Sequence, residues 1–178
     1  MNIRELGREE IEGIWNIDRG EVIDNIYYYE NGELVLKHEH YNMQGWMPGE
    51  PEKYTPILYD CFDRGGIFYG VFEFRRLIGA VVLESKYIGK KKDQLQLKFL
   101  HVDRSYRKKG LGKVLFDKAV EKAQLMGARK LYISATPSEN TVNFYIHLGC
   151  VVTDELDKEL YEFEPEDIHL DFTLPLPI

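Results

Sequence analysis

The sequence predicts an α/β fold in which helices cover both faces of a central sheet. In the C-terminal half, segments with the patterns of strands and helices alternate, as they do when helices pack on a sheet. The chain has 178 residues, 44% of them hydrophobic, which suits a single core. No repeat or low-complexity linker divides it, and we therefore expect residues 1–178 to form one domain.

The N-terminal third is expected to begin with a strand at residues 1–6 and a helix at residues 8–17, where apolar side chains recur at helical spacing. Residues 26–40 contain two strand-like runs around Asn31-Gly32, a dipeptide typical of two-residue hairpin turns. A stretch with Pro-Gly punctuation then precedes residues 51–62, which we interpret as a helix.

The middle of the chain is expected to form three strands. Residues 66–74 and 77–88 are rich in branched and aromatic side chains, and Arg75-Arg76 would be the turn between these two antiparallel strands. After a charged turn at residues 90–93, residues 94–102 provide the third strand.

The C-terminal segments alternate in type. From Gly110 to Met126 apolar residues recur at helix periodicity, and Gly127 stands where a left-handed C-terminal cap belongs. A second helix is expected to reach Leu148, with Thr136 as its N-cap, because Thr-Pro-Ser-Glu is a helix-start pattern. Strands are further expected at residues 131–135, around residues 151–156 and at residues 168–174.

Composition argues against several classes of protein. The net charge of −7 and pI near 5.3 argue against nonspecific nucleic-acid binding. No apolar run is long enough for a membrane span, and the N-terminus lacks the features of a secretory signal, so we expect no membrane partner and a cytoplasmic location. Cys61 and Cys150 lack partners at metal-like spacing, and His38 with His40 supply only two ligands, so we expect no disulfide and no metal.

Basic residues are concentrated in one short stretch of this acidic chain. Residues 98–113 contain six Lys or Arg and one Asp, a charge of +5, which leaves −12 for the rest. The stretch leads into a helix whose first turn carries Gly110 and Gly112. Free main-chain N–H groups, the helix dipole and missing Cβ atoms together favour binding of a phosphate group. The alternative is an ordinary solvated turn.

Two common phosphate-binding motifs do not fit this stretch. A P-loop needs Ser or Thr after Gly-Lys, but Val114 follows Lys113. The dinucleotide-binding motif needs a third glycine at the position of Leu115. The glycine pattern that the stretch does contain is R-x-x-G-x-G at residues 107–112, which follows a predicted strand.

A second motif, FYIHLGC at residues 144–150, lies on the next predicted helix. Together with R-x-x-G-x-G it resembles the GNAT superfamily of N-acetyltransferases, over roughly residues 67–152. The resemblance implies a mixed, mostly antiparallel twisted sheet of about six to seven strands with helices on both faces. It also implies acetyl-CoA as cosubstrate, no metal, and acetyl transfer to a primary amine by direct attack.

The resemblance also implies roles for individual residues. Loop amides would hold the pyrophosphate of acetyl-CoA, and the strand before the loop would pair with the pantetheine arm. The implied cofactor-binding residues are Leu100, His101, Val102, Arg107, Lys108, Lys109, Gly110, Leu111, Gly112, Lys113, Ser138 and Asn140. The chain departs from the family pattern before the second motif, where Ser138 and Thr141 replace the Asn and Ala that are common there.

By the same resemblance Tyr145 would be the general acid that protonates the departing thiolate, since a phenol is protonated at neutral pH. The alternative is a core tyrosine. No general base stands out. Gln96 and Lys98 share a strand face with Leu100, whereas His101 points to the other face unless the strand is distorted. Further candidates on neighbouring strands are Glu73 and Glu84.

The acceptor is expected to be an amine of a small molecule or peptide. An aromatic and acidic stretch could attract such a cation with Tyr27, Tyr28, Tyr29, Tyr41, Trp46, Glu30, Glu33 and Glu39. These aromatic side chains could instead pack on the core or on a second copy, which would give a homodimer. A noncatalytic module that binds acyl-CoA is the alternative function that the sequence leaves open.

Overall fold

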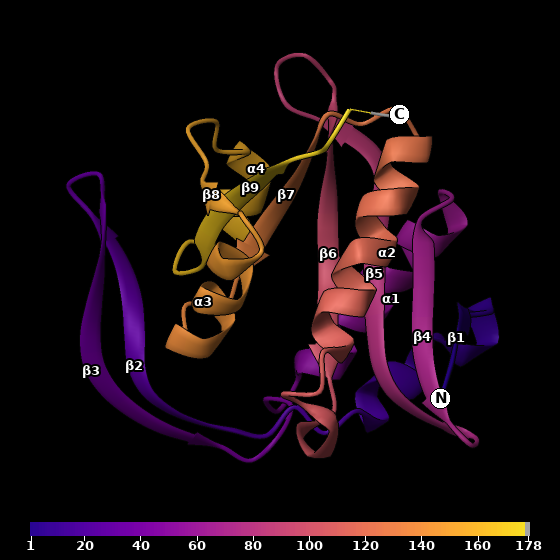
Figure 1. The fold of residues 1–178 in the computed structure, drawn as a ribbon. Helices are drawn as coiled ribbons and strands as arrows, with labels where there is room; N and C mark the ends of the chain where they lie inside the picture. Colours follow the sequence, from indigo (N-terminus) through magenta and orange to yellow (C-terminus); the bar gives the residue numbers. More distant parts are fainter. Residues whose placement is uncertain (177–178) are drawn as a thin grey trace.

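The computed structural model describes residues 1–176, and its strands form two sheets (Figure 1). The strands are β1 (Asn2–Glu5), β2 (Glu21–Glu30), β3 (Glu33–Met43), β4 (Ile67–Glu73), β5 (Arg76–Ile88), β6 (Gln94–Val102), β7 (Lys130–Ala135), β8 (Val151–Val152) and β9 (Ile168–Thr173). The α-helices are α1 (Glu50–Asp63), α2 (Leu111–Leu125), α3 (Glu139–His147) and α4 (Lys158–Phe163). The 3-10 helices are η1 (Arg8–Asn16) and η2 (Arg104–Tyr106).

Seven strands form the central sheet in the order β1-β4-β5-β6-β7-β9-β8. Within the described residues β6 and β7 pair in parallel, and the other neighbours in this sheet are antiparallel. β2 and β3 form a separate antiparallel hairpin, in which β2 lies beside α3 and also approaches β9 (Figure 1). The expected mixed, mostly antiparallel sheet is therefore confirmed.

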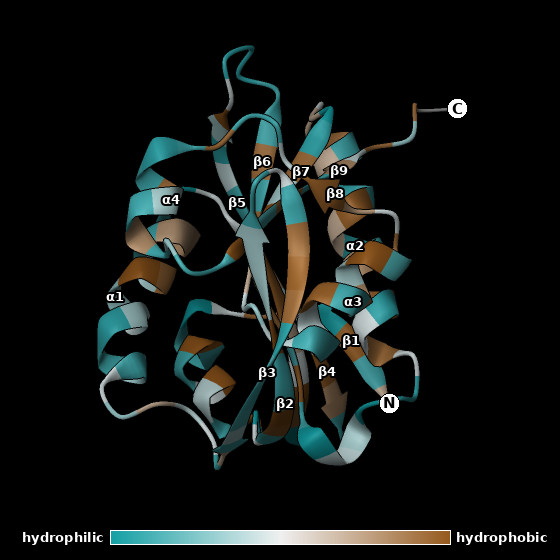
Figure 2. Ribbon diagram, turned by 90° about the vertical axis from the view of Figure 1, so that its left-hand side faces the viewer, coloured by the Kyte–Doolittle hydropathy of each residue, from teal (hydrophilic) through white to brown (hydrophobic). Residues whose placement is uncertain are grey.

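Helices cover both faces of the sheet (Figure 2). On one face α2 and α3 bury Leu115, Phe116 and Val142 against strand side chains. On the other face η1 and α1 bury Ile11 and Leu58 in a second cluster. Removing these apolar surfaces from water is the main stabilising contribution to such a fold. No helix within residues 1–176 is long and apolar enough to cross a membrane.

Most predicted segments are confirmed with small shifts at their ends. The helix expected at residues 8–17 is of the 3-10 type, and the hairpin strands are longer than expected. The turn between β4 and β5 lies at Phe74-Arg75, because Glu73 pairs with Arg76. The short helix α4 was not expected from the sequence.

The predicted start of the second helix is wrong. Helix α3 begins at Glu139 with Ser138 as its N-cap, so Thr136 does not cap it. The reason is a contact from far along the chain, because the Tyr27 N–H group donates to the Pro137 carbonyl (2.8 Å) and holds this segment extended beside β2. Local helix-start chemistry is overridden by pairing with the hairpin.

Strands β6 and β7 separate after a short parallel contact, and Figure 1 shows the gap widening between them. Gln94–Gln96 pair with Lys130–Tyr132, and the strands then continue without pairing with each other. We call this wedge the splay. A bulge on the β5 side of β6 leaves Lys98 without a pairing partner in β5. An extra residue reverses the alternation of side chains, so Gln96 and Lys98 share a face with Phe99 and His101.

Candidate functional site

The loop between β6 and α2, residues 103–110, is rich in basic residues and presents a row of free main-chain donors. We call it the basic loop. Within residues 1–176, the N–H groups of residues 108–113 donate no hydrogen bond to the protein. Gly110, the N-cap of α2, has φ +83°, and Lys108 also has a positive φ of 61°. Such left-handed residues turn successive N–H groups toward one side, where an anion can bind them together with the positive end of the helix dipole.

The two glycines of the loop have different physical roles. At Gly110 a Cβ would meet no atom within 4 Å, so the positive φ is what requires glycine there. At Gly112 a Cβ would lie only 3.0 Å from the ring of Phe144 on α3. The sequence alone predicts that both glycines serve the close approach of a phosphate. The structure instead assigns Gly112 to the close packing of α2 against α3.

The Arg107 side chain points away from this row of donors. Its Nε donates to the Val102 carbonyl (3.0 Å), and its two terminal nitrogens donate to the carbonyls of Gly20 (2.8 Å) and Asp18 (3.3 Å). Asp103, which is fully buried, accepts a hydrogen bond from the Asp18 N–H group (3.1 Å). Arg107 thus ties the basic loop to the segment between η1 and β2.

The remaining charged and polar candidates lie around the loop and α3. The Lys109 ammonium lies over the ring of Tyr106, and Lys113 pairs with Asp117 one helical turn further on (2.5 Å). Ser138 is buried and donates to Thr141. Finally, Asn140 donates to Glu21 on β2. Both Ser138 and Asn140 are therefore engaged in protein contacts at the junction of α3 and the hairpin.

The main chain of β6 faces the splay at two of the three expected residues. The Asp103 N–H group donates to Ile78 of β5 (2.8 Å). Main-chain groups alternate in direction along an antiparallel strand, so those of His101 point toward β5. Those of Leu100 and Val102 point into the splay and are free for an extended ligand, apart from the Val102 carbonyl that Arg107 occupies.

Tyr145 lies on α3, on the face of the sheet that α2 also covers. Its side chain is 5% exposed, and its ring packs near Phe116 and Phe144. Burial raises the pKa of the Tyr145 hydroxyl above its usual value, so the group is protonated at neutral pH. The hydroxyl has no hydrogen-bond partner within residues 1–176, which leaves its proton available to a bound molecule.

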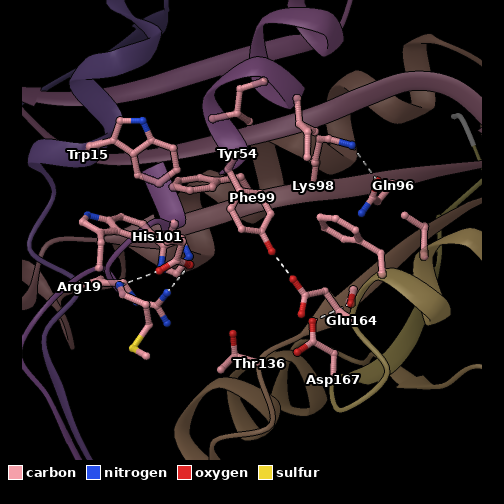
Figure 3. Close-up of a pocket in the computed structure, with 18 of the residues that line it drawn as sticks. Trp15, Arg19, Tyr54, Gln96, Lys98, Phe99, His101, Thr136, Glu164 and Asp167 are labelled. Atoms are coloured by element: carbon pink, nitrogen blue, oxygen red, sulfur yellow. Dashed lines mark hydrogen bonds and ion pairs between the residues drawn. The ribbon is translucent and has the colours of Figure 1, made fainter. Parts of the chain in front are cut away.

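A cavity of about 350 Å³ lies on the opposite face, between β6, β7, α1 and the segment from α4 to β9 (Figure 3). Because of the bulge, Lys98, Phe99 and His101 all line it. Trp46 stacks on Phe99 (5.8 Å between ring centres) and contacts His101 edge-on. Burial in this aromatic wall lowers the pKa of His101 to about 3, so its imidazole is neutral at neutral pH.

Two carboxylates point into the cavity from the segment between α4 and β9 (Figure 3). Glu164 accepts a hydrogen bond from the hydroxyl of Tyr54 on α1. Asp167 accepts one from Ser134 Oγ on β7 (2.7 Å). Burial, with a further contribution from the negative charge of Glu164, raises the pKa of Asp167 to about 6. Neither carboxylate is recognisable from the sequence, because an acidic Glu-Pro-Glu-Asp run more often marks a solvated loop.

The two carboxylates that the sequence suggests as general bases, Glu73 and Glu84, lie outside this cavity. Glu84 is buried against Arg64 (2.7 Å) and Lys98 (3.4 Å), and these cations help to hold its pKa down to about 2 despite burial. Glu73 accepts a hydrogen bond from the Tyr106 hydroxyl near the basic loop. Neither carboxylate contributes to the cavity lining.

Most side chains of the aromatic and acidic stretch also lie elsewhere. Trp46 lines the cavity, but Tyr27 donates to Asn143 of α3 and helps to attach the hairpin. Tyr28 and Tyr41 both donate to Glu39 on the exposed hairpin surface. No three metal-ligating side chains gather anywhere within residues 1–176.

Comparisons with known proteins agree with this architecture. The sequence profile of the Acetyltransferase (GNAT) family matches residues 29–150. A nourseothricin acetyltransferase structure is similar with a TM-score of 0.71 at 16% identity, covering 98% of both chains. A protein described as a streptothricin acetyltransferase from Bacillus anthracis, in complex with acetyl coenzyme A, has a TM-score of 0.71 at 18% identity, covering 99% of this chain and 98% of that one. An aminoglycoside 6'-acetyltransferase type Ii has a TM-score of 0.65 at 16% identity, covering 99% and 100%. No curated protein sequence matches significantly.

Proposed function

Because the chain belongs to the Acetyltransferase (GNAT) family, we propose that it is an N-acetyltransferase that moves an acetyl group from acetyl-CoA to a primary amine of a small molecule or peptide. The observation that carries this proposal is the free N–H row at residues 108–113, which stands beside a splay that meets an acidic cavity. The N–H row suits an anionic cosubstrate, and the acidic cavity suits a cationic acceptor.

The residues of this chain fit acetyl-CoA. The amides of residues 108–113 would bind the pyrophosphate, and the basic side chains around them would add favourable charge. The free main-chain groups of Leu100 and Val102 would pair with the pantetheine arm. Bound acetyl-CoA supplies an activated acetyl thioester. Tyr145 holds a proton for the departing sulfur, and the enclosing strands keep the two substrates in contact.

The cavity supports a cationic acceptor. Its aromatic walls and the carboxylates Glu164 and Asp167 offer cation–π and ionic contacts to an alkylammonium group. Relatives named for nourseothricin, streptothricin and aminoglycosides point to polyamine-like antibiotics as the first acceptors to examine. The direct experiment is an amine panel with acetyl-CoA, with release of the free thiol as the signal. Binding of acetyl-CoA without thiol release on any amine would favour the noncatalytic module.

Replacing Tyr145 with Phe tests the general acid. We expect kcat to fall about 10²-fold, the lower range for general acids, with the Kd for acetyl-CoA and the Tm unchanged. The Tm should hold because the lost hydroxyl makes no hydrogen bond within the described chain. Tyr132→Phe is the matched control, since that buried hydroxyl bonds to His169 (2.8 Å) and its loss should lower Tm with kcat retained. Equal losses of kcat in both variants would contradict a role for Tyr145.

A further inference from the structure

Asp167 differs from the other carboxylates of the cavity in its pairing. Glu50 is bound to Arg19 (2.9 Å), and Glu164 lies 3.8 Å from the Lys53 ammonium. Asp167 has no Lys, Arg or His nitrogen within 4.0 Å among residues 1–176 and is held only by Ser134. A largely buried carboxylate without a cation is unfavourable unless something else supplies the positive charge.

The position of Asp167 relative to the splay defines what it can reach. Ser134 lies two residues beyond Tyr132, the last β7 residue that pairs with β6. Thr136, which follows on the same side, also lines the cavity, and Figure 3 shows both acidic side chains pointing toward the space between these segments. Asp167 thus stands where the acceptor cavity meets the open end of the wedge between the two strands.

We propose that Asp167 binds the ammonium group of the acceptor and takes one of its protons, which makes it the general base of the reaction. This inference rests on the proposed function. The carboxylate is fixed by Ser134 and faces the cavity that receives the amine. No residue singled out from the sequence lies in this position.

The proton balance is complete without a further reactant. Asp167 removes one proton from the ammonium group, and this proton later passes to solvent. The neutral amine then forms the new C–N bond as the C–S bond breaks. Tyr145 gives its proton to the sulfur and recovers one from the nitrogen that has become an amide. The products are the acetylated amine, the free thiol and one proton.

The surroundings of Asp167 set the pH at which it can act. The charged and titratable groups that face it from its own segment and from the neighbouring elements are Glu164, Glu166, Arg19, Glu50, Tyr54, Lys98 and His101. With its pKa raised to about 6, Asp167 is mainly deprotonated at neutral pH and protonated below that value. Activity that depends on Asp167 should therefore be present above about pH 6 and be lost as the pH falls through it.

The first test is the pH profile of kcat/KM. The wild-type profile with ethylamine should show an acid limb near pH 6. Asp167→Asn should remove this limb and lower the plateau about 10²- to 10³-fold, within the range for general bases. Glu166→Gln removes an exposed neighbouring charge and should keep the plateau, while moving the limb to lower pH. An unchanged limb in Asp167→Asn would overturn the proposal.

The second test separates proton removal from simple attraction. Ethylamine is protonated at neutral pH, whereas 2,2,2-trifluoroethylamine is largely neutral and needs no base before attack. At one fixed pH, Asp167→Asn should lose about 10²-fold with ethylamine and less than tenfold with the fluorinated amine. Equal losses with both amines would overturn a role as proton acceptor.

A third measurement does not depend on turnover. In the full chain with labelled aspartate, the Asp167 carboxyl signal should titrate near pH 6, and ethylammonium chloride should lower that pKa by placing a cation beside it. No response to ethylammonium would overturn the binding step. If the wild type releases thiol and Asp167→Asn keeps its affinity for acetyl-CoA, a negative result concerns Asp167 alone and leaves the proposed function intact. If the wild type acetylates no amine, the proposed function itself fails.

Discussion

At the scale of single residues, the conformation of Gly110 decides where the free N–H groups of the basic loop point. Gly127 provides a natural comparison at the other end of α2. Both glycines have nearly the same φ, +83° and +85°, and a Cβ on either would meet no atom within 4 Å. The two residues therefore differ in their place on the helix rather than in local strain.

Replacing each of these glycines with Ala separates backbone strain from ligand binding. Either variant should lose about 1 kcal/mol of stability, because an L-residue is disfavoured at such a φ. Only Gly110→Ala should weaken acetyl-CoA binding, by about tenfold, since relaxing its φ redirects the neighbouring N–H groups. Calorimetric titration and thermal denaturation measure the two effects. Equal affinity in both variants would show that Gly110 does not shape the binding site.

Individual roles are also where sequence reasoning reached its limit. The sequence indicated the residues of the basic loop, but the partner of a flexible side chain such as Arg107 depends on distant carbonyls. The sequence does not point to the proposed base, Asp167, for a similar reason. Its assignment depends on its hydrogen bond with Ser134 of β7 and on its burial, and neither can be recognised from residues 164–167 alone.

At the scale of elements, the basic loop owes its shape to the segment between η1 and β2. The Arg104 N–H group donates to the Asp18 carbonyl (2.8 Å), and Arg107 adds bonds to the carbonyls of Asp18 and Gly20. The Asp103 carboxylate accepts a hydrogen bond from the Asp18 N–H group. This set of contacts holds the start of α2 in place before any ligand is present.

Arg107→Lys tests this structural role, because it keeps the charge but loses the planar fork that reaches three carbonyls. We expect a loss of about 2 kcal/mol, or roughly 5 °C in Tm, from broken charge-assisted hydrogen bonds. Lys108→Gln is the control. It should leave Tm unchanged and weaken acetyl-CoA binding at low salt. If Arg107→Lys kept the wild-type Tm, the carbonyl contacts would not stabilise the loop.

Elements with strong local patterns were predicted well. The run at residues 94–102 coincides with β6, and the helix after Gly110 has its expected length. The errors occurred where distant parts of the chain meet, as at Pro137, which pairs with the hairpin. The bulge at Lys98 likewise depends on pairing with β5, and it moves Phe99 and His101 to the cavity face.

At the scale of the whole molecule, the two proposed substrate sites lie on opposite faces of the sheet, and in the proposed reaction the substrates would meet in the splay. Helices α2 and α3 bring the free N–H row and Tyr145 to one face. Helix α1 and the segment before β9 build the acidic cavity on the other face. The parallel pair β6–β7 ends early, so the gap in the sheet would connect the two proposed sites.

This arrangement predicts that the proposed base reduces the stability of the fold. Asp167 has a pKa of about 6 in the folded chain and about 3.9 when unfolded, so the folded state holds its proton more tightly. Its ionisation therefore lowers stability progressively as pH rises from about 4 to about 6, and the loss persists above that.

Asp167→Asn, which can still accept the Ser134 hydrogen bond, should raise stability at pH 8 by about 1–2 kcal/mol, or roughly 3–6 °C in Tm. Near pH 4 the carboxyl group is protonated in the folded wild type, so the two proteins should then unfold at nearly the same temperature. Thermal denaturation of both proteins across this range gives the comparison. A variant that is less stable than the wild type at pH 8 would mean that the Asp167 charge is already compensated within the protein, and an ammonium group would not be needed beside it.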